Sequence, residues 1–243
     1  MAVKRSHSGS RVLTVLEAIA GHQPIGIRAL GRLLGEDKSA IQRAVMTLAD
    51  AGWIRMARQP PARWEVSARI LAVAHTAQGS HDLRRRARPL LEQLRDETRE
   101  TLLLVVPDVQ CFVIADVVES RQVLRMVPHV GTIVDARNTA TGRALLPFMD
   151  AAQQSALLGS EPDAALVRGF ASTREHGYAV SDGETNPSAL NIAAAIVEYD
   201  GSPAGAIVLT APRERVPAPL QERFGRTLAA AAQELSRRRL ADP

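Results

Sequence analysis

The segment that most constrains this chain is IRALGRLLGEDKSAIQRAVMTLADAGW, residues 27–53. It predicts two short helices joined by a tight turn. Gly35 ends the first helix, because glycine tolerates the left-handed backbone of a helix stop. Asp37 is placed to accept hydrogen bonds from the free backbone N–H groups that begin the second helix. The buried face of the second helix is apolar at i, i+4 and i+7, which are Ile41, Val45 and Leu48.

The opposite face of this second helix, expected over residues 38–52, carries short donors and cations. Such side chains suit base edges and phosphates better than they suit a helix that only needs to be hydrated. Two helices with a glycine-bearing turn and such a second helix are typical of a helix-turn-helix. The candidate DNA contacts on the second helix are Lys38, Ser39, Gln42, Arg43 and Thr47.

A β-hairpin is predicted directly after the two helices, with strands at 53–57 and 63–66 and a proline turn at 59–62. This hairpin would be the wing of a winged helix-turn-helix. Arg55, Arg58 and Arg63 lie on or beside it and are expected to reach phosphates or a minor groove. The alternative is a small helical domain with an ordinary hairpin and scattered surface arginines, since helix pairs are common.

The distribution of charge favours the DNA-binding interpretation. Residues 1–80 contain 11 Lys and Arg against 5 Asp and Glu, whereas residues 81–243 contain 19 against 21. The basic excess therefore coincides with the helix-turn-helix, where a polyanionic partner would require it.

The chain has 243 residues, of which 46% are hydrophobic, so it can bury one large or two modest cores. Its single cysteine, Cys111, cannot form an internal disulfide and fits a reducing cytoplasm. Cys111 lies in an apolar run and is interpreted as a small buried hydrophobe. No apolar run is long enough for a membrane span or a signal peptide, so we expect a cytoplasmic protein with no membrane partner.

The period of the apolar pattern divides the chain into three parts. Residues 1–66 are the expected winged helix-turn-helix domain, 67–80 a linker helix, and 81–243 an effector-binding and oligomerisation domain. The predicted helices cover 10–20 (capped by Ser10), 68–77 (broken by Gly79-Ser80), 83–99, 140–149, 162–176 and 219–240. The predicted strands cover 101–107, 110–120, 123–127, 177–180, 190–199 and 205–210. This order predicts an α+β fold with a largely antiparallel central sheet.

The expected effector domain shows no catalytic or metal-binding motif. Its histidines lack the spacing of a helical metal site, and no P-loop, dinucleotide fingerprint or hydrolase elbow is present. Asp182 and Glu184 flank Gly183, which indicates a turn, and Ser181 has no evident base. We expect no cofactor, no metal and no catalysis. The alternative is an enzyme with an accessory DNA-binding module, which would need a base near Ser181 or Cys111.

Two polar segments are set among the apolar ones. Residues 135–142 (DARNTATG) enter a helix, where backbone N–H groups and threonine hydroxyls can hold a carboxylate or similar anion. Asn191 interrupts an apolar strand, and a polar side chain inside a sheet needs a partner. Asn191 either satisfies a neighbouring loop or contacts a ligand at the mouth of a pocket.

The chain resembles the IclR family of bacterial transcription regulators over about residues 8–240. The resemblance rests, in order, on RVLTVLEAIA, LGRLLGEDKSAIQRAVMTLADAGWI, VGTIVDARNTATGRALL, REHGYAVSDGE and NIAAAIVEYDGSPAGAIVLTAP. It implies an N-terminal winged helix-turn-helix, a linker helix and a GAF-like effector-binding domain. It further implies a double-stranded DNA operator, a homodimer or dimer of dimers, and a small-molecule effector.

The resemblance also implies where the effector would bind. The expected contacts are Leu124, Met126, Asn138, Thr139, Ala140, Thr141, Ser181, Asp182, Asn191 and Thr210, with Phe112 and Met126 as an apolar wall. Such a wall suggests a small aromatic molecule or a short organic acid.

Overall fold

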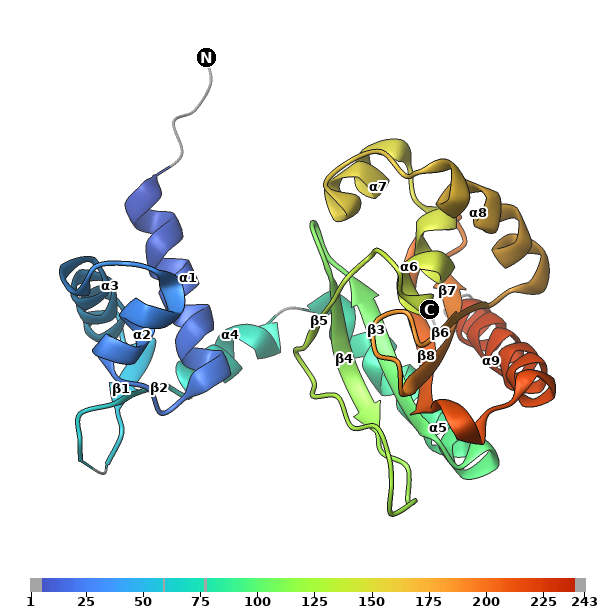
Figure 1. Ribbon diagram of the computed structural model, residues 1–243, viewed down its shortest axis with the longest axis horizontal. Helices are drawn as coiled ribbons and strands as arrows, with labels where there is room; N and C mark the ends of the chain where they lie inside the picture. The colour runs from blue at the N-terminus through green and yellow to red at the C-terminus, as the bar shows by residue number, and fades with distance from the viewer. Residues whose placement is uncertain (1–5, 59, 77, 239–243) are drawn as a thin grey trace. The chain divides into compact units, whose positions relative to one another are not determined.

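The computed structural model describes residues 6–58, 60–76 and 78–238 of the chain (Figure 1). They form two compact units, Met1–Gln78 and Gly79–Pro243. No helix within the described residues is both long and apolar enough to cross a membrane.

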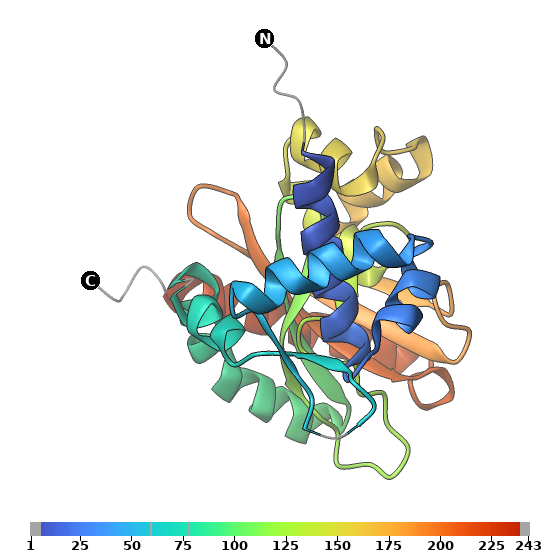
Figure 2. The same ribbon diagram turned by 90° about the vertical axis from the view of Figure 1, so that its left-hand side faces the viewer.

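The first unit is a bundle of short helices with a hairpin, which faces the viewer in Figure 2. Its elements are α1 (His7–His22), α2 (Ile27–Leu34), α3 (Lys38–Asp50), β1 (Ile54–Met56), β2 (Trp64–Val66) and α4 (Arg69–Thr76). Val15, Ile19, Leu30 and Ile41 are fully or almost fully buried, and Trp64 of the hairpin closes the same core. The helix-turn-helix and the wing hairpin predicted from the sequence are therefore both present.

Local sequence fixes the ends of these helices. Gly35 has a φ of 66° at the end of α2, and Gly52 has a φ of 76° after α3. Both values lie in the left-handed region that glycine adopts without a steric penalty. One boundary was predicted wrongly. Helix α1 begins at His7 with Ser6 as its N-cap, which accepts from the backbone N–H of Gly9, so Ser10 lies inside the helix.

The second unit combines a six-stranded sheet with helices. Its strands are β3 (Thr101–Pro107), β4 (Phe112–Val118), β5 (Ile133–Val134), β6 (Ala179–Asp182), β7 (Ala189–Val197) and β8 (Pro203–Pro212). Its helices are α5 (Gln78–Thr98), α6 (Ala140–Leu145), η1 (Leu146–Phe148), α7 (Ala151–Leu158), α8 (Ala164–His176), η2 (Arg213–Arg215) and α9 (Ala218–Arg238). The strand order is β5-β4-β3-β8-β7-β6, and every pair is antiparallel, which confirms the α+β class.

Helices cover both faces of this sheet (Figure 1). Helices α5 and α9 pack on one face against Leu102, Ile192 and Leu209. Helices α6, α7 and α8 lie over the other face, where Leu103, Ala193 and Val208 point. Successive residues of β3 thus serve two different cores, as the period of two in a strand requires.

Two expectations about this unit were wrong. Residues 123–127 are not a strand, because β5 already pairs with the outer edge of β4 at Phe112 and Val113. The segment instead forms part of a long loop, in which Val123 is fully exposed. Gly79 and Ser80 do not break a helix, since α4 ends at Thr76 and α5 already begins at Gln78.

Candidate DNA-binding surface and ligand cavity

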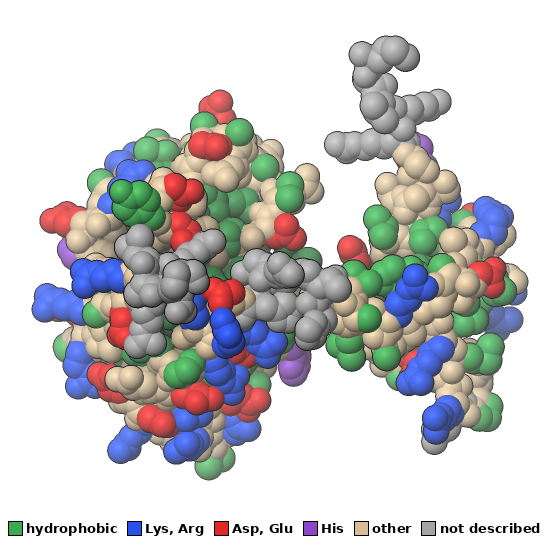
Figure 3. Space-filling view, turned by 180° about the vertical axis from the view of Figure 1, so that it is seen from behind, with side chains coloured by type: hydrophobic (Ala, Val, Ile, Leu, Met, Phe, Trp, Pro, Cys, Tyr) green, Lys and Arg blue, Asp and Glu red, His purple; other side chains and the backbone are tan. Residues whose placement is uncertain are grey.

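The outer face of α3 is exposed along its length. Lys38, Ser39, Gln42, Arg43 and Thr47 all lie on it, opposite the buried Ile41, Val45 and Leu48. The side chains of Lys38 and Gln42 have no hydrogen-bond or ion-pair partner within the described part of the chain, so their donors are available. Figure 3 shows more Lys and Arg than Asp and Glu side chains on the visible face of this smaller unit.

Three of these side chains, Ser39, Arg43 and Thr47, also make hydrogen bonds within the helix or to its N-cap, Asp37. Asp37 Oδ1 accepts from the backbone N–H of Ser39 at 2.8 Å, from its hydroxyl at 2.7 Å and from the N–H of Ala40 at 2.9 Å. The hydrogen bond from the Ser39 side chain is the largest cause that lowers the pKa of Asp37 below its ordinary value. Arg43 Nη1 donates to Ser39 Oγ at 3.2 Å, and the Thr47 hydroxyl donates to the carbonyl of Arg43 at 2.9 Å. Ser39 is therefore committed mainly to capping α3, whereas Arg43 keeps donors for a further contact.

The three wing arginines differ in whether their side chains already contact other groups of the protein. Arg55 Nε pairs with Glu65 Oε1 across the hairpin at 2.9 Å. Arg63 Nη1 lies 3.5 Å from the carbonyl oxygen of Pro24. Arg58, an exposed residue two positions after β1, has no side-chain partner among the residues that the structure describes. Arg58 is thus the wing side chain best placed to reach a phosphate without breaking an internal contact.

A cavity of about 510 Å³ lies in the second unit between the sheet and the start of α6. Its floor comprises Leu103 and Val105 of β3, Ile114 of β4, and Val208 and Thr210 of β8. The loop at 119–132 and the loop at 183–188 form two of its walls. This volume is in the range of small-molecule sites.

A row of polar side chains crosses the sheet at one end of the cavity. Ser181, Asn191, Thr210 and Thr101 pair in register across β6, β7, β8 and β3, so they share one face of the sheet. Two of the four, Asn191 and Thr210, line the cavity, and Thr141 of α6 lines it too. The side chains of these three cavity residues have no hydrogen-bond partner among the described residues, although Thr141 and Thr210 are each only 4% exposed. These polar side chains line the cavity and are not paired with protein groups in the described part of the chain, so they are available to an occupant.

Six of the expected effector contacts line this cavity. They are Met126, Thr139, Ala140, Thr141, Asn191 and Thr210. The hydroxyl of Thr139 is already used, because it donates to the carbonyl of Asp135 at 2.6 Å and accepts from the N–H of Gly142 at 3.0 Å. Helix α6 has only six residues. The expected anion site at its start is therefore not supported by the geometry.

The other five expected contacts lie outside the cavity. Phe112 is fully buried in the core beneath α6, and the side chain of Leu124 is largely exposed. Ser181 Oγ bonds to the carbonyl of Asn138 and to Glu184. Asp182 pairs with Arg213 Nε at 2.6 Å. Asn138, with a left-handed φ of 54°, faces a different cavity.

Sequence reasoning missed most of the floor and part of both walls. The overlooked lining residues are Leu103, Val105, Ile114, Val127, Pro128, Thr132, Ile133, Val134, Thr185, Asn186, Ala189 and Val208, whereas Asp135 belonged to the expected polar segment 135–142. For Val208 the signal was available, since it precedes Thr210 by two residues on the same strand and must share its face. The loop residues carried no comparable periodic signal.

The second cavity, of about 540 Å³, lies between α8 and β6 and includes Asn138. Its cations are already engaged. Arg143 donates to the carbonyl of Val180 and pairs with Glu184, both at 2.8 Å. Arg137 bonds to the carbonyl of Leu158 and to Ser160. We therefore take the cavity over β3, β7 and β8 as the candidate ligand site.

Half-buried Cys111 fits neither site. Burial and, to a lesser extent, the nearby Asp108 raise the pKa of its thiol above the ordinary value, which disfavours the nucleophilic thiolate. Among the described residues, no group of three or more His, Cys, Asp and Glu side chains could hold a metal ion.

Comparison with protein families assigns the second unit. The family model described as the C-terminal domain of the bacterial transcriptional regulator IclR matches residues 75–237, which is more than half of the chain. The chain belongs to the IclR family of bacterial transcriptional regulators. A further model, described as HVO_A0114, matches residues 10–66.

Individual relatives agree with this assignment. The transcriptional repressor IclR of Escherichia coli K12 is 25% identical and aligns over 97% of this chain and 90% of its own. An IclR regulator structure from Silicibacter sp. TM1040 superposes with a TM-score of 0.78 at 23% identity and covers 95% of both chains. An IclR homologue from Microbacterium hydrocarbonoxydans in complex with 4-hydroxybenzoate has a TM-score of 0.76 at 19% identity and covers 95% of this chain and 99% of its own.

Proposed function

We propose that this IclR-family regulator binds operator DNA through α3 and the wing, and that a small organic molecule in the β3/β7/β8 cavity controls this binding. The observation that carries the ligand half is the set of unsatisfied polar groups of Thr141, Asn191 and Thr210 around an apolar floor. Sites of this kind hold a ligand by a few directed hydrogen bonds on an apolar surface. The exposed polar face of α3 is the observation that supports DNA binding.

The apolar floor and the relative in complex with 4-hydroxybenzoate support a small aromatic or short organic acid as the effector. The ligand and DNA sites lie in separate units of the chain. Binding of the effector must therefore differ in free energy between two states of the protein, if it is to change the affinity for DNA.

We further propose that the protein acts in the cytoplasm as a homodimer or a dimer of dimers on a pseudo-palindromic operator. An enzyme with a DNA-binding module is the weaker alternative, because Glu184, the carboxylate that accepts from Ser181 Oγ, is itself ion-paired with Arg143, and the relatives are transcription regulators.

Arg43→Ala should weaken binding to the operator by about 1–3 kcal/mol, the usual contribution of a good bidentate base contact. The measurement is a titration of DNA from upstream of the protein's own gene at a fixed salt concentration. Arg84→Ala, which removes a half-exposed arginine of α5, is the matched control and should leave the affinity unchanged. Equal affinities for the parent and Arg43→Ala would contradict the assignment of Arg43 as a base contact.

Asn191→Ala should weaken binding of 4-hydroxybenzoate, or of the strongest ligand in a thermal-shift screen of small organic acids, by roughly two- to twelvefold. That range corresponds to the net worth of one hydrogen bond of about 0.5–1.5 kcal/mol. Asn138→Gly is the control, because it removes an amide from the second cavity and glycine tolerates the positive φ there. Calorimetry that shows a loss for Asn138→Gly and none for Asn191→Ala would move the ligand to the second cavity.

A further inference from the structure

The single turn η2 follows β8 and carries two arginines, Arg213 and Arg215. Between them they contact both loops that form walls of the ligand cavity. One wall loop, residues 119–132, contributes Met126, Val127, Pro128 and Thr132 to the cavity. The other, residues 183–188, contributes Thr185 and Asn186. Neither loop has regular secondary structure. Each must therefore be held in place by contacts other than a helix or strand ladder.

Arg215 joins the first wall loop to a buried carboxylate. Its Nε and Nη2 donate to the two carboxylate oxygens of Glu100 at 2.8 and 2.6 Å. Its Nη1 donates to the carbonyl of Leu124, inside the loop, at 2.7 Å. The side chain of Glu100 is only 6% exposed, so its charge depends on this forked ion pair. One guanidinium thus satisfies a buried anion and a loop carbonyl at the same time.

Arg213 makes the corresponding contacts on the other side. Its side chain pairs with Asp182, the last residue of β6 before the second wall loop. Its backbone N–H donates to the carbonyl of Ser188, at the far end of that loop, at 3.0 Å. Two arginines of one three-residue turn therefore contact segments on both sides of the cavity.

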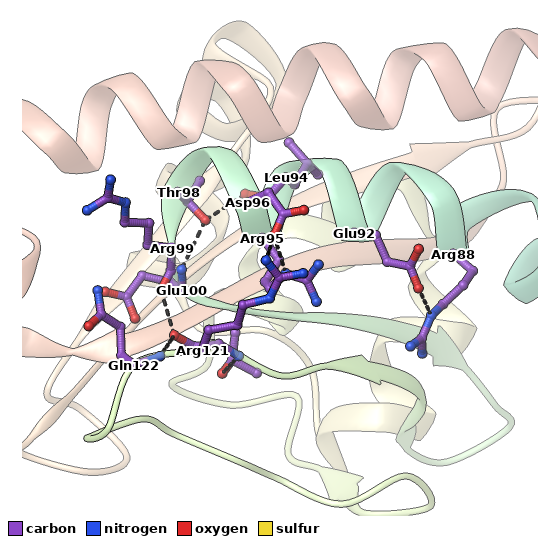
Figure 4. Close-up of polar contacts among 12 residues, drawn as sticks. Arg88, Glu92, Leu94, Arg95, Asp96, Thr98, Arg99, Glu100, Arg121 and Gln122 are labelled. Carbon is purple, nitrogen blue, oxygen red and sulfur yellow. Dashed lines mark hydrogen bonds and ion pairs between the residues drawn. The ribbon is translucent and has the colours of Figure 1, made fainter.

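The first wall loop is also attached to the end of α5 (Figure 4). Ser120 Oγ donates to the carbonyl of Arg99 at 2.6 Å, and the N–H of Gln122 donates to Ser120 Oγ at 3.1 Å. Arg99 directly follows α5 and has a left-handed φ of 61°, a costly conformation that persists only where the surroundings enforce it. The next residue is Glu100, the partner of Arg215. The wall loop, η2 and the end of α5 are therefore connected through adjacent residues.

We propose that Arg215 and Glu100 are positioning residues of the ligand cavity, which fix the 119–132 wall against the end of α5 without touching the ligand. The functional meaning of this role rests on the function proposed above. A lysine at position 215 keeps the charge but has a single ammonium group, which cannot reproduce the fork to Glu100 together with the bond to Leu124. Loss of the paired hydrogen bonds between Arg215 and Glu100 should make the 119–132 loop more mobile while the sheet stays folded.

The test is hydrogen–deuterium exchange with mass spectrometry on the full chain without ligand. In Arg215→Lys, exchange of the hydrogen-bonded amides in residues 121–132, those of Gln122, Gly131 and Thr132, should rise by roughly tenfold or more through local opening, with β3 and β8 unchanged. Glu100→Gln should give the same localised pattern, because it removes the charge that orients Arg215. Arg226→Lys is the matched control, since Arg226 only forms an exposed ion pair with Glu222 on α9.

Unchanged exchange in residues 121–132 would overturn the proposal. So would a uniform rise across the second unit, because it would show a general stabilising role. The measurement needs no ligand, so its outcome is independent of the proposed function. A localised rise in a protein that binds no small molecule would sustain the positioning role and refute the ligand site.

Discussion

Gly142→Ala should destabilise the second unit at or above the upper end of the range of about 1–3 kcal/mol that is typical of overpacking. Gly142 lies in α6, at the edge of the ligand cavity. A Cβ added there would lie 1.9 Å from the carbonyl oxygen of Ala136, and that neighbour is backbone that cannot rotate away. Helix α6 and the segment that contains Ala136 would have to move apart, and since residues 139–141 line the cavity, ligand binding should be weakened as well. Chemical denaturation of the full chain measures the effect.

Gly169→Ala is the control for this substitution. Gly169 also lies within a helix, α8, but a Cβ there would meet nothing within 4 Å. Since alanine is favoured over glycine in a helix interior, this variant should be stabilised by about 0.5–1 kcal/mol. If both variants shifted in the same direction, the close approach of α6 to Ala136 would not be present in solution.

Ile41→Ala and Gln42→Ala, at neighbouring positions of α3, should separate folding from DNA recognition. Ile41 is fully buried in the core of the first unit, so its truncation should cost about 2–5 kcal/mol of stability. Gln42 is exposed, and its truncation should change stability by no more than about 0.5 kcal/mol while it weakens DNA binding. Thermal unfolding and DNA titration on the same preparations check both. A destabilised Gln42→Ala variant with normal DNA affinity would contradict the assigned orientation of α3.

The sequence alone determined the parts of this protein that depend on local periodicity. The buried stripe of α3, its Asp37 cap and the Gly35 stop follow from spacing within one helix turn, and the structure shows all three. Asn191 was also identifiable as unusual, because a polar residue stands out inside an apolar strand, whereas Thr210 was expected only from the resemblance to the IclR family. Their orientation toward one cavity follows from the pairing of β7 with β8.

Only the tertiary structure decided which residues complete the cavity. Between β3 and β4 the register shifts, so that Leu104 pairs with Asp116 but Val105 pairs with Ile114. This bulge directs Asp116 toward Arg84 and Arg88 of α5, while Ile114 joins the cavity floor on the opposite face. No periodic pattern predicts a bulge, because one extra residue reverses the facing of everything beyond it.

The wall of the cavity was equally inaccessible to sequence reasoning. Residues 123–127 form a mostly apolar run that predicted a strand, but the edge of β4 is already occupied by β5, and the segment remains a loop. What holds that loop is Arg215, which is 115 positions from Glu100 and 91 from Leu124. Spacing within the sequence carries no information about an ion pair of that kind, because only the pairing of β8 with β3 brings Arg215 close to Glu100.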